Sequence, residues 1–346
     1  MQAHCNKGPG HWQRLSAPVR AAWGGPGADF IAIIRAVRIF LAVLSTAGNS
    51  IVVVLDQTSV TVGLIQLQAS PDPEVNLQRT MASIRQAAAQ GAHIICLQEL
   101  FRSGYFCQSE DTAHFRLAEP IPGPTTATLG ALAAELRVVL IVPIFEQRAP
   151  GLYHNSAVVF DADGTLLGTY RKMHIPDDPS YYEKFYFTPG DLGYQTYQTR
   201  YATVGLLICW DQWFPEAARL TVLSGAQILF YPSAIGWHDE EPPEVARAQH
   251  EAWEMVQRGH AITNGVYVAT VNRVGREGTV TFWGASFVAA PSGQLVAKAS
   301  HNEEATLLAT CDLTAIDTMR QNWPFLRDRR IDTYNALTSR FIDHGR

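Results

Sequence analysis

The chain has 346 residues, of which 47% are hydrophobic and 17% are charged, and its formal net charge is -5 at pH 7. This composition excludes an intrinsically disordered chain, which would be poorer in apolar residues. The negative charge argues against the broad basic face of a nucleic-acid-binding protein. Because the sequence contains no clean apolar run of about 18 residues, we expect no membrane-spanning helix.

The five cysteines are widely spaced, and none belongs to a Cys-x-x-Cys pair. An odd number of cysteines without such pairs argues against both a disulfide framework and a structural zinc site. We therefore expect reduced thiols in a cytoplasmic protein. Most of them should fill the core, since free cysteine is among the most buried residue types.

Residues 1–58 differ in composition from the rest of the chain. They carry five basic residues against two acidic ones, and their Gly- and Pro-rich part, 8–27, precedes an apolar stretch at 30–44. Three interpretations stay open: a targeting segment, a regulatory extension that packs on the body, or poorly structured sequence upstream of the true domain. We favour the last, so that residues 59–346 form one catalytic domain.

From residue 60 onward, strand and helix patterns alternate. The predicted strands are 60–68, 93–98, 138–145, 155–160, 166–170, 202–208, 227–231, 266–271, 287–290, 295–299 and 306–311. The predicted helices are 74–90, 125–136, 214–223 and 244–263, followed by a helical, basic end with Arg327, Arg329 and Arg330. Turn sequences at 161–164 and 291–293 predict two hairpins. The pattern indicates an α/β layered body with one mixed sheet or two stacked sheets.

Three polar residues follow predicted strands, where an α/β sheet presents side chains to a ligand. Cys209 precedes a helix, whose N-terminus favours a thiolate over a thiol. Glu99 ends an apolar run, and Lys172 follows a hairpin strand. Each residue alone has a structural explanation: a buried cysteine, a solvated strand end and a surface lysine. Together they supply a nucleophile, a base and a cation for an oxyanion.

The segments around these residues resemble the three motifs of the nitrilase superfamily, the carbon–nitrogen hydrolases. The matching segments are 97–101, 170–176 and 207–211, and the resemblance spans about residues 60 to 332. It implies a four-layer αββα sandwich of the nitrilase type, with mixed β-sheets, and no metal or organic cofactor. It also implies that Cys209 is the nucleophile, Glu99 the general base and Lys172 the cation that holds the oxyanion.

The same resemblance implies roles for further residues. The backbone N–H of Trp210 would be the second oxyanion donor. Glu183 matches a second active-site glutamate, which would position Lys172 or assist a proton transfer; the alternative is a loop glutamate paired with Lys184. We expect His174 to be structural support rather than a direct participant in catalysis.

Within the superfamily, the longest matching segments are with the branch that hydrolyses N-carbamoylputrescine to putrescine, ammonia and carbon dioxide in polyamine biosynthesis. These segments are 98–101, 105–108, 170–177, 183–187, 209–219, 231–236 and 325–330. The stretch 237–249 departs from the family pattern. Two rivals stay open: a related hydrolase of another carbamoyl or ω-amide substrate, and a non-catalytic binding scaffold.

The residues near the nucleophile allow a physical check of the substrate. Relatives that bind a substrate carboxylate place an arginine just after the nucleophile, yet residues 210–213 include no cation. Aromatic faces and carboxylates suit an ammonium tail, and 237–241 is an aromatic and acidic stretch, unless it is simply a solvated loop. We expect Tyr105, Trp210 and Trp237 to line the substrate. The expected partners are a small molecule with a cationic amine tail and further copies of this chain, with no nucleic acid or membrane.

Overall fold

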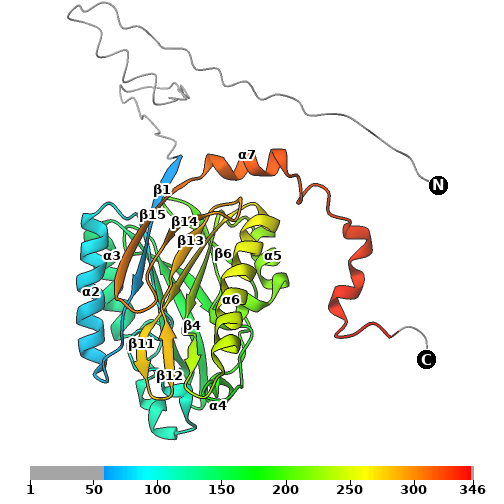
Figure 1. The fold of residues 1–346 in the computed structure, drawn as a ribbon. Helices are drawn as coiled ribbons and strands as arrows, with labels where there is room; N and C mark the ends of the chain where they lie inside the picture. The colour runs from blue at the N-terminus through cyan, green and yellow to red at the C-terminus, as the bar shows by residue number, and fades with distance from the viewer. Residues whose placement is uncertain (1–57, 344–346) are drawn as a thin grey trace, which may run out of the picture. The chain divides into compact units, whose positions relative to one another are not determined.

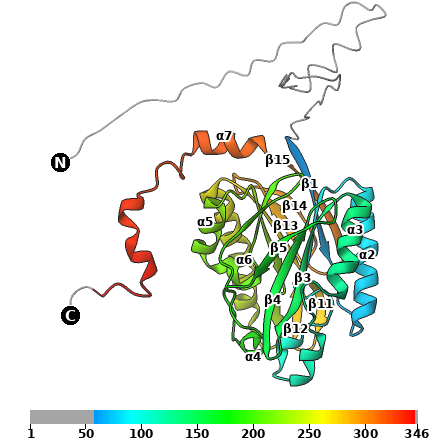
Figure 2. The ribbon, with the colours of Figure 1, turned by 180° about the vertical axis from the view of Figure 1, so that it is seen from behind.

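The computed structural model describes residues 58–343. The predicted extension 1–58 lies outside them except for its last residue, so its three interpretations stay predictions. The described chain forms two stacked six-stranded sheets with helices on both outer faces (Figures 1 and 2). This confirms the predicted αββα layering.

The first sheet has the strand order β15-β1-β2-β3-β4-β5. Its central strands β1, β2 and β3 run parallel, and the remaining pairs are antiparallel. The strands are β1 (Ser59–Gln66), β2 (Ile94–Leu97), β3 (Val139–Ala149), β4 (Leu152–Phe160), β5 (Leu166–Arg171) and β15 (Ala305–Asp312). The predicted hairpin at 161–164 joins β4 to β5, with Gly164 in the left-handed conformation that a tight turn needs.

The second sheet has the strand order β14-β13-β10-β8-β7-β6, with β7, β8 and β10 parallel. The strands are β6 (Thr196–Gln198), β7 (Thr203–Leu206), β8 (Ile228–Ser233), β10 (Tyr267–Asn272), β13 (Phe287–Ala289) and β14 (Leu295–Lys298). The predicted hairpin at 291–293 joins β13 to β14. A third, small sheet consists of β9 (Gly236–His238), β11 (Val274–Glu277) and β12 (Val280–Trp283).

Helices cover the outer faces of the two large sheets. The first sheet contacts α2 (Pro73–Ala89) and α3 (Pro124–Leu136), and the second contacts α5 (Pro215–Leu223) and α6 (Pro243–Asn264). The shorter helices are α4 (Glu183–Tyr186) and α7 (Thr314–Asn322). Short 3₁₀ helices are η1 (Phe106–Gln108), η2 (Thr112–Leu117), η3 (Cys209–Trp213), η4 (Ile331–Thr333) and η5 (Asn335–Thr338). Within residues 58–343, none of the helices is both long enough and apolar enough to cross a membrane.

The alternation of side chains along the strands builds two separate cores. Ile94 and Cys96 of β2 pack between the sheets, whereas Ile95 and Leu97 pack under α2 and α3. The strand is therefore apolar on both faces, as expected for a parallel strand inside a layered fold.

The structure corrects the sequence-based prediction in two places. The C-terminal helix α7 ends at Asn322, so Arg327, Arg329 and Arg330 lie beyond it and are not helical. Pro324 explains the end of the helix, because proline disfavours helical backbone in the residue before it. The small third sheet is not predicted, since its strands are only three or four residues long.

Candidate active site

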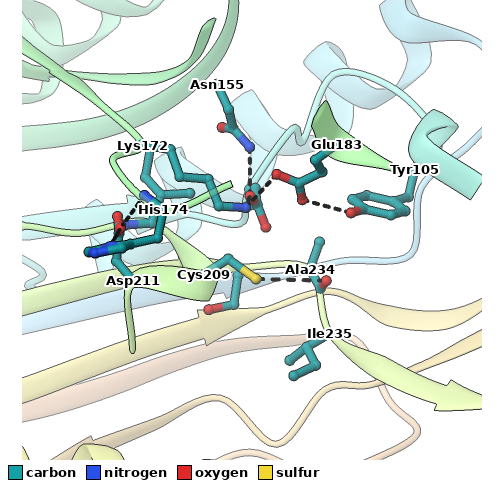
Figure 3. A network of polar contacts seen from close by, with 12 residues as sticks. Tyr105, Asn155, Lys172, His174, Glu183, Cys209, Asp211, Ala234 and Ile235 are labelled. Atoms are coloured by element: carbon teal, nitrogen blue, oxygen red, sulfur yellow. Dashed lines mark hydrogen bonds and ion pairs between the residues drawn. The ribbon is translucent and has the colours of Figure 1, made fainter. Parts of the chain in front are cut away.

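The three predicted site residues lie beyond the carboxyl ends of strands from both large sheets. Glu99 follows β2 and Lys172 follows β5 in the first sheet, whereas Cys209 follows β7 in the second. Stacking of the sheets brings these ends together, and Figure 3 shows the side chains of Lys172, Glu183 and Cys209 pointing toward one another.

Cys209 occupies a strained turn that leads from β7 into η3. Its φ angle of 43° lies in the left-handed region, which residues with a side chain seldom adopt. Such a conformation costs on the order of 1–3 kcal/mol and persists where the surroundings enforce it, often at functional sites. The Sγ atom lies 3.9 Å from the carbonyl oxygen of Ala234, which follows β8. The turn therefore holds the thiol at the junction of two parallel strands.

Asp211 holds this turn in place from inside the fold. Its carboxylate accepts hydrogen bonds from the backbone N–H of Ile208 (2.9 Å) and from the Tyr170 hydroxyl (2.7 Å). It also accepts one from the backbone N–H of His174 (3.0 Å) and lies 2.7 Å from the His174 ring. The ring of His174 stacks on Phe214 with centroids 3.6 Å apart. These contacts agree with the expected structural role of His174.

Lys172 is the centre of a fully buried ion cluster. Its Nζ atom lies 2.8 Å from Oε1 of Glu99 and 2.6 Å from Oε2 of Glu183, and all three side chains are at most 1% exposed. The backbone of Lys172 is held as well, because its N–H donates to Asn155 and its carbonyl accepts from Gly190, both at 2.8 Å. The ammonium group is therefore fixed in position.

Glu183 lies at the start of the single-turn helix α4 and belongs to this cluster. Its second oxygen, Oε1, accepts a hydrogen bond from the Tyr105 hydroxyl at 2.7 Å, whereas Lys184 is exposed. The predicted proximity of Glu183 to Lys172 is thus present, and the alternative pairing with Lys184 is not. Burial raises the pKa of Glu183 to about 7, although the neighbouring ammonium of Lys172 opposes this shift.

The charges of the cluster determine which groups are ionised. Burial alone would lower the pKa of Lys172, but the carboxylates of Glu183 and Glu99 outweigh it and raise this pKa well above its usual value. For Cys209, burial and then the Glu99 charge raise the pKa of the thiol well above its usual value, against the effect of Lys172. Burial and the Glu99 charge thus act against the thiolate that the helix N-terminus and Lys172 favour, and the expected thiolate character of Cys209 stays a prediction.

Sequence reasoning missed Asn155, whose side chain reaches Glu99. The residue lies on β4, and its Nδ2 atom donates a hydrogen bond of 2.7 Å to Oε1 of Glu99. The available signal was a run of three polar residues, His154, Asn155 and Ser156, just before the apolar end of the strand, and such a run does not by itself reveal the partner of Asn155. Within residues 58–343, no group of three or more His, Cys, Asp or Glu residues is arranged to hold a metal ion.

A pocket of about 590 Å³ lies next to the turn that carries Cys209, although Cys209 and the cluster residues are not among those that line it. Trp210 and Ile235, the residues that follow Cys209 and Ala234, belong to its wall. Among the described residues, those that line the pocket include no Lys or Arg, and they include three carboxylates. The lining residues are Asp178, Pro179, Tyr181, Trp210, Trp213, Ile235, Gly236, His238, Glu240, Glu241, Pro242, Gln249 and Ala252.

The three aromatic residues expected at the substrate differ in their placement. Trp210 lines the pocket, and Tyr105 lies behind it, with its ring against Tyr181 at a centroid distance of 5.5 Å. Trp237 does not line it: its indole N–H donates to the carbonyl of Ala246, and its ring packs against Trp283. Side chains alternate along β9, so its neighbours Gly236 and His238 line the pocket instead, and contact of Trp237 with the substrate stays a prediction.

Comparison with known proteins agrees with this geometry. The family model described as carbon-nitrogen hydrolase matches residues 61–321. The chain belongs to the carbon–nitrogen hydrolase family. This hydrolase is 46% identical to N-carbamoylputrescine amidase of Arabidopsis thaliana, with 80% of this chain and 95% of the relative covered. It is 39% identical to a citrullinase of Francisella tularensis, over 82% of this chain and 99% of the relative.

Solved structures of related proteins have the same fold as this hydrolase. The crystal structure of a carbon-nitrogen hydrolase from Helicobacter pylori G27 is 48% identical, with a TM-score of 0.80 over 82% of this chain and 100% of the other. Saccharomyces cerevisiae Nit3, a member of branch 10 of the nitrilase superfamily, is 28% identical, with a TM-score of 0.66 over 79% of this chain and 97% of the other. The predicted superfamily and its fold are thereby confirmed.

Proposed function

We propose that this enzyme hydrolyses N-carbamoylputrescine to putrescine, ammonia and carbon dioxide, with Cys209 as nucleophile, Glu99 as general base and Lys172 as oxyanion cation. The observation that carries the proposal is a thiol beside a buried Lys172 cluster, next to an acidic pocket without Lys or Arg in its described lining. The 46% identity to amidases named for this substrate, in Arabidopsis thaliana and Solanum lycopersicum, supports it.

In the first half of the reaction, Glu99 accepts the proton of Cys209 as the sulfur attacks the carbamoyl carbon. The negative oxygen that forms is held by Lys172 and by the backbone N–H of Trp210, each donor being worth on the order of 10²–10³ in rate. Glu99 then gives the proton to the departing nitrogen, the carbon–nitrogen bond breaks, and a thioester with Cys209 remains.

In the second half, Glu99 accepts a proton from water as the water oxygen attacks the thioester. The carbon–sulfur bond breaks, and the proton returns to the sulfur of Cys209. The carbamic acid that is released then breaks its remaining carbon–nitrogen bond in solution, which gives carbon dioxide and the second amine. Glu183 keeps Lys172 in place throughout, since its Oε2 accepts a second hydrogen bond from the ammonium that also binds Glu99. The raised pKa of Cys209 fits a scheme in which the base accepts the proton as the sulfur attacks.

The pocket supports a substrate tail that ends in an ammonium group. Asp178, Glu240 and Glu241 provide negative charge, and Trp210 and Trp213 provide aromatic faces. An amino-acid tail such as that of citrulline also carries a carboxylate, for which the described lining offers no Lys or Arg partner. Leaving that carboxylate unpaired in the pocket would oppose binding.

A substrate panel read by ammonia release tests the proposal. We expect the kcat/KM for N-carbamoylputrescine to exceed those for L-citrulline, N-carbamoyl-β-alanine and an ω-amide by about 100-fold or more, or about 2.7 kcal/mol. Cys209→Ala, shown to be folded by circular dichroism, is the control and should lose essentially all activity. Equal kcat/KM values across the panel would contradict selection for an ammonium tail. Release of no ammonia from any substrate would favour a binding scaffold.

We further propose that the enzyme is a cytoplasmic homo-oligomer, at least a dimer. The four described cysteines are all unpaired and buried, which suits a reducing compartment. The C-terminal segment 323–343 exposes large apolar side chains such as Phe341 (79% exposed) and Ile331 (69%). An apolar surface of this kind commonly marks a protein–protein contact, and a second copy of the chain is the partner that we propose.

A further inference from the structure

The two carboxylate oxygens of Glu99 have different surroundings. Oε1 accepts two hydrogen bonds, from Nζ of Lys172 at 2.8 Å and from Nδ2 of Asn155 at 2.7 Å. Oε2 is buried and has no hydrogen-bond partner within residues 58–343. A buried carboxylate oxygen without a donor is costly, which suggests that its partner is a reacting group.

We propose that Asn155 is a positioning residue that keeps Oε1 of Glu99 as the anchored oxygen and leaves Oε2 as the oxygen that exchanges the proton. The inference rests on the thiol-hydrolase mechanism proposed above, but it does not depend on the identity of the substrate tail.

Lys172 cannot provide this orientation alone, because its ammonium group is shared between Glu99 and Glu183. A carboxylate held by a single hydrogen bond could turn about it and present either oxygen. The second donor, Asn155, comes from the middle of the β4 ladder, where Ser156 pairs with Ile144 and Arg171. A neutral amide also holds the carboxylate without competing for the proton that the carboxylate must accept.

Asn155 connects the two catalytic groups of the first sheet. Its side chain binds Glu99, and its backbone carbonyl accepts the N–H of Lys172 at 2.8 Å. A single residue of β4 therefore contacts both the base and the oxyanion cation and fixes their relative positions. Cys209 comes from the other sheet, and the charge of Glu99 lies close enough to raise the pKa of its thiol.

The test compares Asn155→Leu, which has a similar shape but no donor, with Asn155→Asp, which adds a negative charge beside Glu99. Both changes disfavour the ionised base, so the acid limb of the kcat/KM profile should move to higher pH, by about one unit in Asn155→Leu and further in Asn155→Asp. Asn264→Leu is the control. Like Asn155, Asn264 is a buried amide, but it lies on α6 and donates to the backbone carbonyl of His260 rather than to a carboxylate. It should leave the limb in place.

The rate at which iodoacetamide alkylates Cys209 is measured across the same pH range. This readout needs no substrate, so it tests Asn155 even if N-carbamoylputrescine proves to be the wrong substrate. We expect the alkylation profile to shift in the same direction as the kinetic profile. A fall in activity with both acid limbs unmoved, in either variant that stays folded by circular dichroism, would overturn the proposal and leave Asn155 a structural residue.

Discussion

At the scale of single residues, the site is built around one buried cation between two buried carboxylates. Removing one partner from a buried ion cluster is far more damaging than replacing the whole cluster by apolar groups, because the remaining charges lose their compensation. Lys172 has 0% side-chain exposure and touches both Glu99 and Glu183. Its contribution to stability should therefore be as large as its contribution to catalysis.

We predict that Lys172→Met lowers the free energy of unfolding at pH 7 by about 3–5 kcal/mol. Without the ammonium, both carboxylates bind protons more tightly in the folded state than in the unfolded state. The loss should therefore be largest at neutral pH and should shrink as the pH falls toward 5. Urea unfolding at the two pH values measures it.

The matched control for this prediction is Lys184→Met, which removes an exposed lysine from the same short helix. It should change stability by no more than about 0.5 kcal/mol. Equal losses in the two variants would show that the buried ion cluster does not support the fold.

Sequence reasoning located Glu99, Lys172 and Cys209 because each one follows a strand and lies in a motif. It could not reveal Asn155 as a partner of Glu99, since the two are 56 positions apart and meet only through the order of β2, β3 and β4. Nor could it show the strained φ angle of Cys209 or the four contacts of Asp211, which depend on tertiary structure.

At the scale of elements, the connection from β9 to α6 supplies much of the acidic wall of the pocket. Glu241 lies in this connection and lines the pocket, where its carboxylate is held by the N–H of His238 at 3.2 Å and by Gln249 at 2.7 Å. Asp239 lies in the same connection but pairs with Arg276 and does not line the pocket. Two neighbouring acidic residues thus have different surroundings.

We predict that Glu241→Gln raises the KM for N-carbamoylputrescine about tenfold, or about 1.4 kcal/mol, with little change in kcat. The reason is that the carboxylate of Glu241 binds the substrate tail equally in the ground state and the transition state, so its removal weakens both to the same extent. Steady-state kinetics measures the split, with Asp239→Asn as the control that leaves KM unchanged. The same rise in KM in both variants would contradict a specific tail contact.

The longer elements were predictable because their apolar patterns run for several residues. Strand β8 and helix α6 lie within two residues of their predicted bounds. Strands β9, β11 and β12 are short, and their pattern is set by pairing with one another rather than by a run of apolar residues. The side-chain direction of Trp237 could not be predicted for the same reason, since it depends on the register of β9 against β12.

At the scale of the whole molecule, the layered architecture follows from alternating strands and helices, but the strand order does not. Strand β15 pairs with β1 although Ser59 and its partner Asp312 are far apart in sequence. No local pattern encodes such a pairing. The sequence therefore predicts which segments are strands and helices and which class of layers they form, and the register requires the structure.

We predict that deletion of residues 323–346 converts the oligomer into a monomer. This deletion removes the exposed apolar side chains beyond α7, including those of Trp323 (48% exposed) and Leu337 (63%). Size-exclusion chromatography with light scattering measures the mass of both proteins. Replacing Arg327 and Arg329 by glutamine is the control for charge alone, and an unchanged oligomer after the deletion would place the contact elsewhere.

The proposed nucleophile and its proposed base come from opposite sheets, Cys209 after β7 and Glu99 after β2. Residue 209 lies in the second half of the polypeptide, so the ribosome completes most of the first sheet before the thiol exists. A nascent or partly unfolded chain can keep its helices and strands and yet have no hydrolytic activity. The proposed hydrolysis therefore requires both sheets to be stacked, because neither sheet alone carries both groups.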